Sequence, residues 1–365
     1  MSYHLQTEMN ITTNYTFITF KKQTILVKRT ILMLGLLAAL GSCKKSPEIQ
    51  KKDDGKLPTD IKLTITNGNQ STDLNQQGDA TYNFLGYGYD ITDQYNDASS
   101  VRSVVINIPS LVKSNPYQFD LSRATTGYWE NYSGETATDL AGKLSQKFDE
   151  TSGLKVFKNT IASAFPGADT FNGKYVYGYY SAISVRMRMR IVDNYNNVLN
   201  SYVTDGFSQD VNTLTTADLV KKYGTHMLRS IAIGSRLNVV YQAEAPSTNR
   251  KMISSTGLRY AMKTIFGLAT GELDPMDLVA LNANTSAKVY FYAVGGDQST
   301  LKESSVNNRT FINPTEWFGS TTEDKARFIG AAEDGLIPLY DLITDVNKKA
   351  VVKAYIIKYI QDNQL

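Results

Sequence analysis

A strict alternation of apolar and polar side chains over residues 180–191 constrains the fold more than any other feature of the chain. The apolar side chains there stand at odd positions: Ile183, Val185, Met187, Met189 and Ile191. Because successive side chains of a strand point to opposite faces, this period of two predicts a strand with one buried face. Residues 101–108, 231–241 and 287–294 alternate in a similar way, so the four segments together predict a half-buried antiparallel sheet.

The opposite face of the same segment carries arginines at positions 186, 188 and 190. Aromatic side chains that could stack on nucleic-acid bases do not accompany them on that face. The first 42 residues hold four of the 38 basic and one of the 35 acidic residues, so the remaining chain is balanced at 34 of each. A chain with equal numbers of basic and acidic residues has no overall electrostatic field that would attract nucleic acid. We therefore expect no nucleic-acid partner, and an arginine face that is solvated or lines a pore.

Histidine and cysteine are scarce, which limits the chemistry that the chain can perform. There are two histidines, His4 and His226, and one cysteine, Cys43. The count argues against a zinc site, which needs about four such ligands, and excludes an internal disulfide. His226 has neither a second histidine nor a carboxylate in its own stretch of sequence. We therefore expect no enzymatic activity, no cofactor and no metal, and a structural role for His226.

An apolar run near the N-terminus predicts secretion. Residues 31–40 are apolar apart from Gly35 and follow the basic pair Lys28-Arg29. The run is too short to span a bilayer but fits the core of a signal peptide. Leu40-Gly41-Ser42-Cys43 resembles the bacterial lipobox, which implies cleavage before Cys43 and lipidation of its thiol. The alternative is an ordinary signal peptide with a chance cysteine.

These features predict three regions. Residues 1–42 are a lipoprotein signal peptide whose start is over-extended, since a start at Val27 would give a compact leader. Residues 43–79 carry the lipidated Cys43 and a polar tether that cannot fold alone, although its alternating Ile61, Leu63 and Ile65 could form an edge strand. Residues 80–365 form the globular domain. The protein is then expected to cross the inner membrane and to be lipid-anchored at the outer membrane or cell surface.

A tetrapeptide between a predicted helix at residues 216–222 and the strand at residues 231–241 points to a family. It reads Tyr223-Gly224-Thr225-His226. This resembles the signature of the membrane attack complex/perforin (MACPF) domain, as found in bacterial lipoprotein members of Bacteroidetes type. Further blocks follow in the family's order: LGYGYDIT at 85–92, Val294-Gly295-Gly296-Asp297, Trp317 and LIPLYDLI at 336–343. The resemblance covers residues 80–363.

The resemblance implies an α+β fold: a bent, twisted four-stranded antiparallel sheet flanked by two helical clusters, as in MACPF proteins and cholesterol-dependent cytolysins. It also implies hinges at which the sheet bends. These fall at Gly295-Gly296 and at Gly234-Ser235, where the family carries a glycine pair. Serine at the second position makes that bend less free, because glycine accepts backbone angles that other residues resist.

In this family the helical clusters unfurl into two β-hairpins per subunit, and a ring of subunits closes a membrane barrel. Here the clusters would be residues 135–174 and 244–286, each longer than the 20–25 or so residues that a spanning hairpin needs. The candidate membrane-inserting residues are Phe157, Ile161 and Phe165 in the first cluster and Leu258, Tyr260, Met262, Phe266 and Leu268 in the second. The second set alternates better, so we expect Met262→Lys to block insertion while leaving the soluble fold intact.

Two functions remain open at this point. The first is a membrane-anchored pore-forming toxin or antimicrobial effector whose partners are a lipid membrane and further copies of itself. The second is a non-lytic surface lipoprotein that binds a receptor or a glycan on a MACPF scaffold. We expect no C-terminal targeting domain after the last predicted helix, at residues 351–360, and such an absence weakens the pore-forming interpretation.

Overall fold

The computed structural model describes residues 63–67, 78–192, 196–245, 247–268, 281, 287–306 and 309–365. All of them belong to one compact unit, residues 55–365. The predicted signal peptide and Cys43 lie outside the described residues. In the described part of the chain, every helix is too short or too polar to cross a bilayer.

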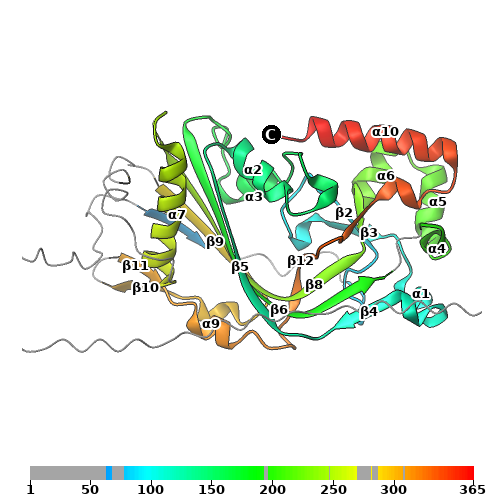
Figure 1. The fold of residues 1–365 in the computed structure, drawn as a ribbon, viewed down its shortest axis with the longest axis horizontal. Coiled ribbons are helices and arrows are strands. Elements are labelled where there is room, and N and C mark those ends of the chain that lie inside the picture. Colours follow the sequence, from blue (N-terminus) through cyan, green and yellow to red (C-terminus); the bar gives the residue numbers. More distant parts are fainter. Residues whose placement is uncertain are drawn as a thin grey trace, which may run out of the picture. The chain divides into compact units, whose positions relative to one another are not determined.

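A seven-stranded sheet forms the centre of this unit (Figure 1). Its strands are β1 (Leu63–Asn67), β4 (Phe119–Ser122), β5 (Thr126–Gly134), β6 (Tyr175–Ile191), β8 (Ser230–Glu244), β9 (Ala287–Val294) and β12 (Arg327–Ala331). The order is β1-β9-β8-β6, and β6 pairs along its outer edge with both β4 and β5, while β12 pairs with β8. Every pairing is antiparallel except that of β1 with β9. Figure 1 shows β5, β6 and β8 bending along their length.

Three of the four predicted strands are confirmed, as β6, β8 and β9, and the first is confirmed only in its first half and in another sheet. Residues 101–104 form β3, a strand of a separate small sheet, and Ile108 begins helix α1 (Ile108–Ser114). The side chain of Asn107 caps this helix by accepting a hydrogen bond from the Ser110 amide. The first long strand of the central sheet is instead β5, whose sequence TGYWENYSG shows no apolar alternation.

A β-bulge corrects the face assignment within β6. Val185 pairs with Gly234 and Met187 pairs with Ile233, so Arg186 is an extra residue. The alternation shifts at this point. Ile183 and Val185 therefore pack in a small cluster with Ala232 and Ile329, whereas Met189 and Ile191 join the main core. The five odd positions do not share one face, and Arg186 is separated from Arg188 and Arg190.

The predicted tether contains a strand. β1 pairs in parallel with β9, with Leu63 opposite Ala287 and Asn67 opposite Phe291. This confirms the alternative that the alternating residues near position 63 form an edge strand. Its neighbour β9 is thereby paired on both edges, with β1 on one and β8 on the other.

Helices cover both faces of the sheet (Figure 1). One face packs α7 (Arg250–Phe266) against side chains such as Leu237 and Tyr241 of β8. The other face packs α2 (Ala137–Ser145) and α3 (Asn159–Ala164) against side chains that include Tyr179 and Val240. The expected arrangement of two helical clusters flanking a bent sheet is thus present, but the sheet has seven strands and not the expected four.

The second cluster is helical because its apolar residues also repeat with helical spacing. Side chains buried against the sheet include Leu258, Ala261, Met262 and Ile265, which stand three or four positions apart. Gly267 ends the helix in a left-handed conformation with φ of 62°, and its amide donates to the Met262 carbonyl. The period of two in the same residues therefore does not make a strand in this state.

A second, four-stranded sheet has the order β13-β7-β2-β3. Its strands are β13 (Leu336–Pro338), β7 (His226–Leu228), β2 (Tyr87–Tyr89) and β3 (Val101–Val104). The remaining elements are α4 (Asn196–Asn200), α5 (Asp205–Thr213), α6 (Thr216–Tyr223), α9 (Thr315–Gly319), α10 (Val346–Asp362) and the hairpin β10–β11 (Glu303–Val306, Arg309–Ile312). Three of the sequence blocks that carried the family resemblance, at 85–92, 223–226 and 336–343, therefore meet in and beside this small sheet.

Candidate functional site

Two backbone segments cross closely where the first two blocks meet. Gly224 has φ of 76°, and a Cβ atom there would lie 2.6 Å from the backbone of Tyr89. On the opposite segment, a Cβ atom at Gly88 would lie 1.9 Å from the Tyr223 carbonyl oxygen. Only glycine fits at either position. The Tyr223 ring is held beside this crossing, since its hydroxyl donates to Asp210 at 2.7 Å and its ring meets Phe207 edge to face.

The next two residues of the tetrapeptide join the third block to the first two. The Thr225 amide donates to the Tyr89 carbonyl at 3.0 Å, and the Thr225 carbonyl accepts from the Leu339 amide at 3.0 Å. The Thr225 hydroxyl accepts from the Ile91 amide at 3.2 Å and lies 3.0 Å from the Nδ1 atom of His226. This tetrapeptide satisfies backbone groups of both neighbouring segments.

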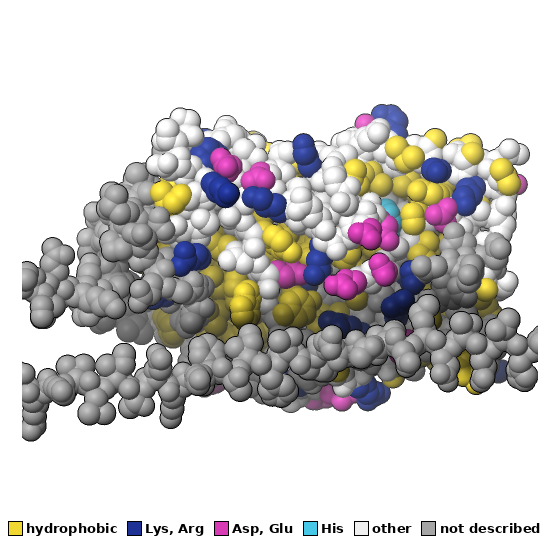
Figure 2. Space-filling view, in the orientation of Figure 1, with side chains coloured by type: hydrophobic (Ala, Val, Ile, Leu, Met, Phe, Trp, Pro, Cys, Tyr) yellow, Lys and Arg dark blue, Asp and Glu magenta, His cyan; other side chains and the backbone are white. Residues whose placement is uncertain are grey.

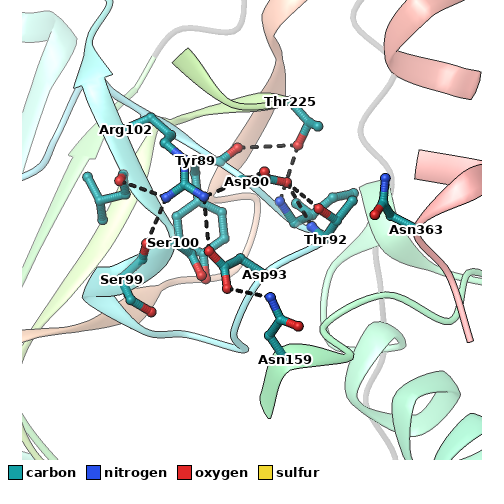
Figure 3. Close-up of polar contacts among 12 residues, drawn as sticks. Tyr89, Asp90, Thr92, Asp93, Ser99, Ser100, Arg102, Asn159, Thr225 and Asn363 are labelled. Atoms are coloured by element: carbon teal, nitrogen blue, oxygen red, sulfur yellow. Dashed lines mark hydrogen bonds and ion pairs between the residues drawn. The ribbon is translucent and has the colours of Figure 1, made fainter. Parts of the chain in front are cut away.

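Beside this crossing, acidic residues of the loop after β2 gather around Arg102 (Figure 3). The Arg102 guanidinium lies 2.9 Å from Asp93 and 3.6 Å from Asp90. Asp90 also accepts from the hydroxyl of Thr92 at 2.8 Å and from the hydroxyl of Tyr359, on α10, at 3.0 Å. The loop is therefore fastened both to its own strand β3 and to the last helix.

The same loop fastens the first helical cluster. Asn159 donates to Asp93 at 3.0 Å, Thr160 accepts from the Tyr95 amide at 2.8 Å, and the Phe157 amide donates to the Ile91 carbonyl at 3.2 Å. Phe157 has φ of 62°, an uncommon conformation for a residue with a side chain. These hydrogen bonds add to the apolar packing that holds the cluster in the main core, and the strained position at Phe157 lies among them.

His226 lines a cavity of about 300 Å³ between this junction and α10. Its side chain is buried, and the lining also includes Glu150, Tyr340 and Ile356. Figure 2 shows hydrophobic side chains (yellow) beside a group of acidic ones (magenta) on this face of the molecule. Burial lowers the pKa of His226 to about 4 and raises the pKa of Glu150. No carboxylate stands near His226 in the sequence, but the distant Glu150 lines the same cavity.

We expect acid to destabilise the protein through His226. The pKa of this side chain is about 4 in the folded protein, against 6.5 for an exposed histidine, so the unfolded chain binds a proton first as the pH falls. The stabilisation is complete above pH 6.5 and is lost between pH 6.5 and 4, which amounts to about 3 kcal/mol. Urea unfolding at pH 7.5 and 4.5 measures this loss. His226→Gln should show a smaller loss over the same range, and an equal loss would mean that other groups carry it.

The predicted hinge residues lie together. A Cβ atom at Gly295 would be 2.5 Å from the Gly234 carbonyl oxygen and 2.8 Å from the Ser235 hydroxyl. Gly295 and Gly296 both have positive φ, and the Trp317 indole donates to the Gly295 carbonyl at 3.0 Å. This is where the neighbour of β8 changes from β9 to β12 and where β6 carries its bulge.

All of the predicted membrane-inserting residues except Leu268 are buried in this state, and Leu268 is partly exposed. The buried ones are Phe157, Ile161 and Phe165 on the α2–α3 side and Leu258, Tyr260, Met262 and Phe266 on α7. Met262 and Ala261 are each 0% exposed. The expectation that Met262→Lys leaves the soluble fold intact is therefore wrong, because a buried, unpaired ammonium is costly.

A buried charged group beneath the first cluster is a feature that no sequence pattern indicated. Arg236 of β8 donates to the Asn96 carbonyl at 3.0 Å, and its guanidinium lies 6.0 Å from the centre of the Tyr95 ring. Glu130 of β5 accepts from the Tyr95 hydroxyl at 3.2 Å and pairs with Lys147 at 3.3 Å. Burial and the nearby Glu130 raise the pKa of Tyr95. In sequence, Arg236 stands at a polar position of an alternating strand, which indicates exposure.

Comparisons with known proteins give the family. The family model of the MAC/Perforin domain matches residues 174–365, just over half of the chain. No curated protein matches the chain. The block at residues 85–92 lies outside the matched range, yet it pairs with the tetrapeptide inside that range.

Two solved structures share the fold. One is a protein with a MAC/Perforin domain from Bacteroides thetaiotaomicron VPI-5482, with a TM-score of 0.61 and 16% identity over 76% of this chain and 60% of that one. The other is GNIP1Aa from Chromobacterium piscinae, with a TM-score of 0.57 and 15% identity over 77% of this chain and 56% of that one. This chain therefore spans less than two thirds of either protein. The family model and the shared fold together show that the chain belongs to the MAC/Perforin domain family.

Proposed function

We propose that this protein forms membrane pores by oligomerising and inserting two β-hairpins per subunit. The observation that carries the proposal is where the helical clusters leave and rejoin the sheet. The first cluster lies between Gly134 and Tyr177, which are directly paired, and the second lies between Gln242 and Lys288, which are also paired. Each cluster can therefore become a hairpin that extends an existing strand pair without a change of topology.

The first cluster supports the hairpin proposal when the register of β5 and β6 is continued into it. Paired residue numbers add up to 311 there, as for Gly134 and Tyr177, so the turn would fall at residues 155–156. Even positions of the first arm then share a face with odd positions of the second. That face would carry Leu140, Leu144 and Phe148 together with Phe157, Ile161 and Phe165.

The opposite face of that hairpin would be polar. It would carry Asp139, Lys143 and Lys147 from the first arm, as a water-filled barrel lumen requires. Polar side chains interrupt the apolar face at Gln146, Asn159, Ser163 and Asp169, and Glu150 would lie near the turn. Tyr175 of β6 is paired with Glu244 of β8, so the two hairpins would extend the same sheet side by side.

The second cluster supports the proposal less well. In its register, paired numbers add up to 530, which puts the turn at residue 265 and Leu258, Met262 and Phe266 on one face. Glu272 and Asp274 have the same parity and would also face lipid. This observation favours the second candidate function, a non-lytic surface protein that uses the scaffold for adhesion or ligand binding.

Dye release from liposomes by purified residues 44–365 tests the proposal. The vesicles should range from phosphatidylethanolamine–phosphatidylglycerol to phosphatidylcholine–cholesterol, since the target membrane, bacterial or host, decides between an antimicrobial effector and a toxin. We expect release from at least one composition, together with ring-like oligomers on the vesicles. Binding without release from any composition would instead support the adhesion function.

We also propose that the protein is a lipoprotein anchored through Cys43. The motivating observation is that the only cysteine of the chain follows Leu40-Gly41-Ser42. In an expressing bacterium, a fatty-acid probe should label the wild-type protein, and Cys43→Ala should remove the label and shift the protein from the membrane to the soluble fraction. Labelling that persists in Cys43→Ala would rule out this anchor.

A further inference from the structure

A cavity of about 510 Å³ lies on the sheet face beside the β6 bulge, within the size range of small-molecule sites. Side chains from β4, β6, β8 and β12 line it, so it is built on the sheet itself. Neither the proposed hairpins nor the predicted hinge glycines account for its polar lining. The bulge creates it in part, because the shifted alternation turns Arg188 and Arg190 toward the same face as Arg236.

The cations of this cavity are largely uncommitted. The guanidinium groups of Arg188 and Arg190 are exposed and make no ion pair or hydrogen bond with any other described side chain. Arg186, on the same strand but outside the cavity, donates instead to the hydroxyls of Thr125 and Thr321. Lys147 also lines the cavity, although it is paired with Glu130.

Arg236 provides an independent indication of a ligand. Its side chain is 2% exposed, it lines the cavity, and its Nε atom is buried with no hydrogen-bond partner among the described residues. A buried donor without a partner costs about 1–3 kcal/mol, more when it is charged. A negatively charged oxygen in the cavity would stabilise the buried guanidinium as a charge, and guanidinium groups bind carboxylate and phosphate through two parallel hydrogen bonds.

The rest of the lining argues against a purely anionic ligand. The carboxylates of Asp120 and Glu333 also line the cavity, and in the described part of the chain neither forms an ion pair. They would repel a bare anion but can accept hydrogen bonds from hydroxyl groups. The hydroxyls of Ser122, Tyr128 and Ser230 add further polar groups.

We propose that this cavity binds a phosphorylated sugar or polyol. Arg188, Arg190 and Arg236 hold its phosphate, and Asp120 and Glu333 accept hydrogen bonds from its hydroxyl groups. The ligand could be a free sugar phosphate or the headgroup of a phosphorylated glycolipid, since both present the same chemistry. This site goes beyond pore formation and does not depend on it, because it is present in the soluble state.

Isothermal titration of the purified full chain tests the site with three soluble probes: glucose 6-phosphate, glucose and inorganic phosphate. We expect saturable binding of glucose 6-phosphate that is about tenfold or more tighter than that of phosphate, with glucose weakest. Arg188→Gln/Arg190→Gln should weaken glucose 6-phosphate binding about tenfold or more, because charge-assisted contacts are lost. Lys113→Gln/Arg123→Gln removes two exposed charges outside the cavity and should leave binding unchanged.

Binding to vesicles distinguishes the two possible sources of the ligand. If the protein sediments with vesicles that contain phosphatidylinositol 4-phosphate, and if this requires Arg188 and Arg190, the ligand is a lipid headgroup. If the protein binds glucose 6-phosphate but not these vesicles, the ligand is a free sugar phosphate. The proposal is overturned if none of the probes binds, if phosphate binds as tightly as glucose 6-phosphate, or if the double cavity variant binds as well as the control variant.

Discussion

Gly88→Ala is expected to lower the free energy of unfolding by about 3 kcal/mol or more, enough to leave much of the protein unfolded. The new Cβ atom would lie 1.9 Å from the Tyr223 carbonyl oxygen. That oxygen belongs to backbone, which cannot swing aside as a side chain can. Relieving the overlap must separate β2 from the tetrapeptide segment, where Thr225 is hydrogen-bonded to Tyr89. Urea unfolding followed by circular dichroism measures the effect.

Gly127→Ala is the matched control for this substitution. Gly127 is also a strand glycine, but its surroundings are open, with the nearest atom 3.9 Å from an added Cβ. We expect a change within about 0.5 kcal/mol there. If Gly88→Ala were as stable as Gly127→Ala, the close crossing of the two family blocks would not exist in solution.

Ser163→Lys is expected to abolish dye release while leaving the soluble protein unchanged. Ser163 is exposed in the soluble structure, so the substitution adds no buried charge. In the proposed first hairpin it stands on the lipid face between Ile161 and Phe165. A lysine there costs about 2–4 kcal/mol near mid-bilayer, and a ring repeats that cost in every subunit. Release from vesicles and thermal melting, measured side by side, check both halves of this expectation.

Ala162→Lys is the control, because it places the same charge one residue away on the lumen face. Ala162 is partly exposed in the soluble state, so the folds of the two variants can be compared directly. We expect Ala162→Lys to release dye at close to the wild-type level. Equal loss in both variants, or full activity in both, would contradict the proposed register of the first hairpin.

The sequence predicted β6, β8 and β9 because their apolar side chains alternate. The expectation of a half-buried sheet was wrong for β8, which is buried on both faces because helices cover both sides of the sheet. The sequence missed β5, since an edge strand of sequence TGYWENYSG has one strand neighbour and little need for apolar alternation. It also misassigned half of the β6 face, because a bulge depends on how Val185 and Met187 pair with the adjacent strand. Local alternation carries no information about such pairing.

The same distinction applies to the candidate sites: local motifs could be recognised in the sequence, whereas contacts across the fold could not. The blocks at residues 85–92 and 223–226 were recognised by their resemblance to the family, and the fold shows why each of them needs a glycine. Contacts made across the fold left no local signal: Glu150 shares a cavity with His226, and Arg236 lies close to Glu130 of β5. Both depend on side chains that are far apart in the chain, so no pattern of spacing could have found them.

The proposed change from helix to hairpin can be measured directly with an environment-sensitive dye on single cysteines at residues 157–165, in a Cys43→Ser background. In the soluble state the buried positions have helical spacing: Phe157, Thr160, Ile161, Ala164 and Phe165. On vesicles that support release, we expect odd positions to contact lipid and even positions water, so that Ser163 moves from water to lipid and Ala164 from the protein interior to water. A helical pattern that persists on those vesicles would contradict insertion of this segment as a hairpin.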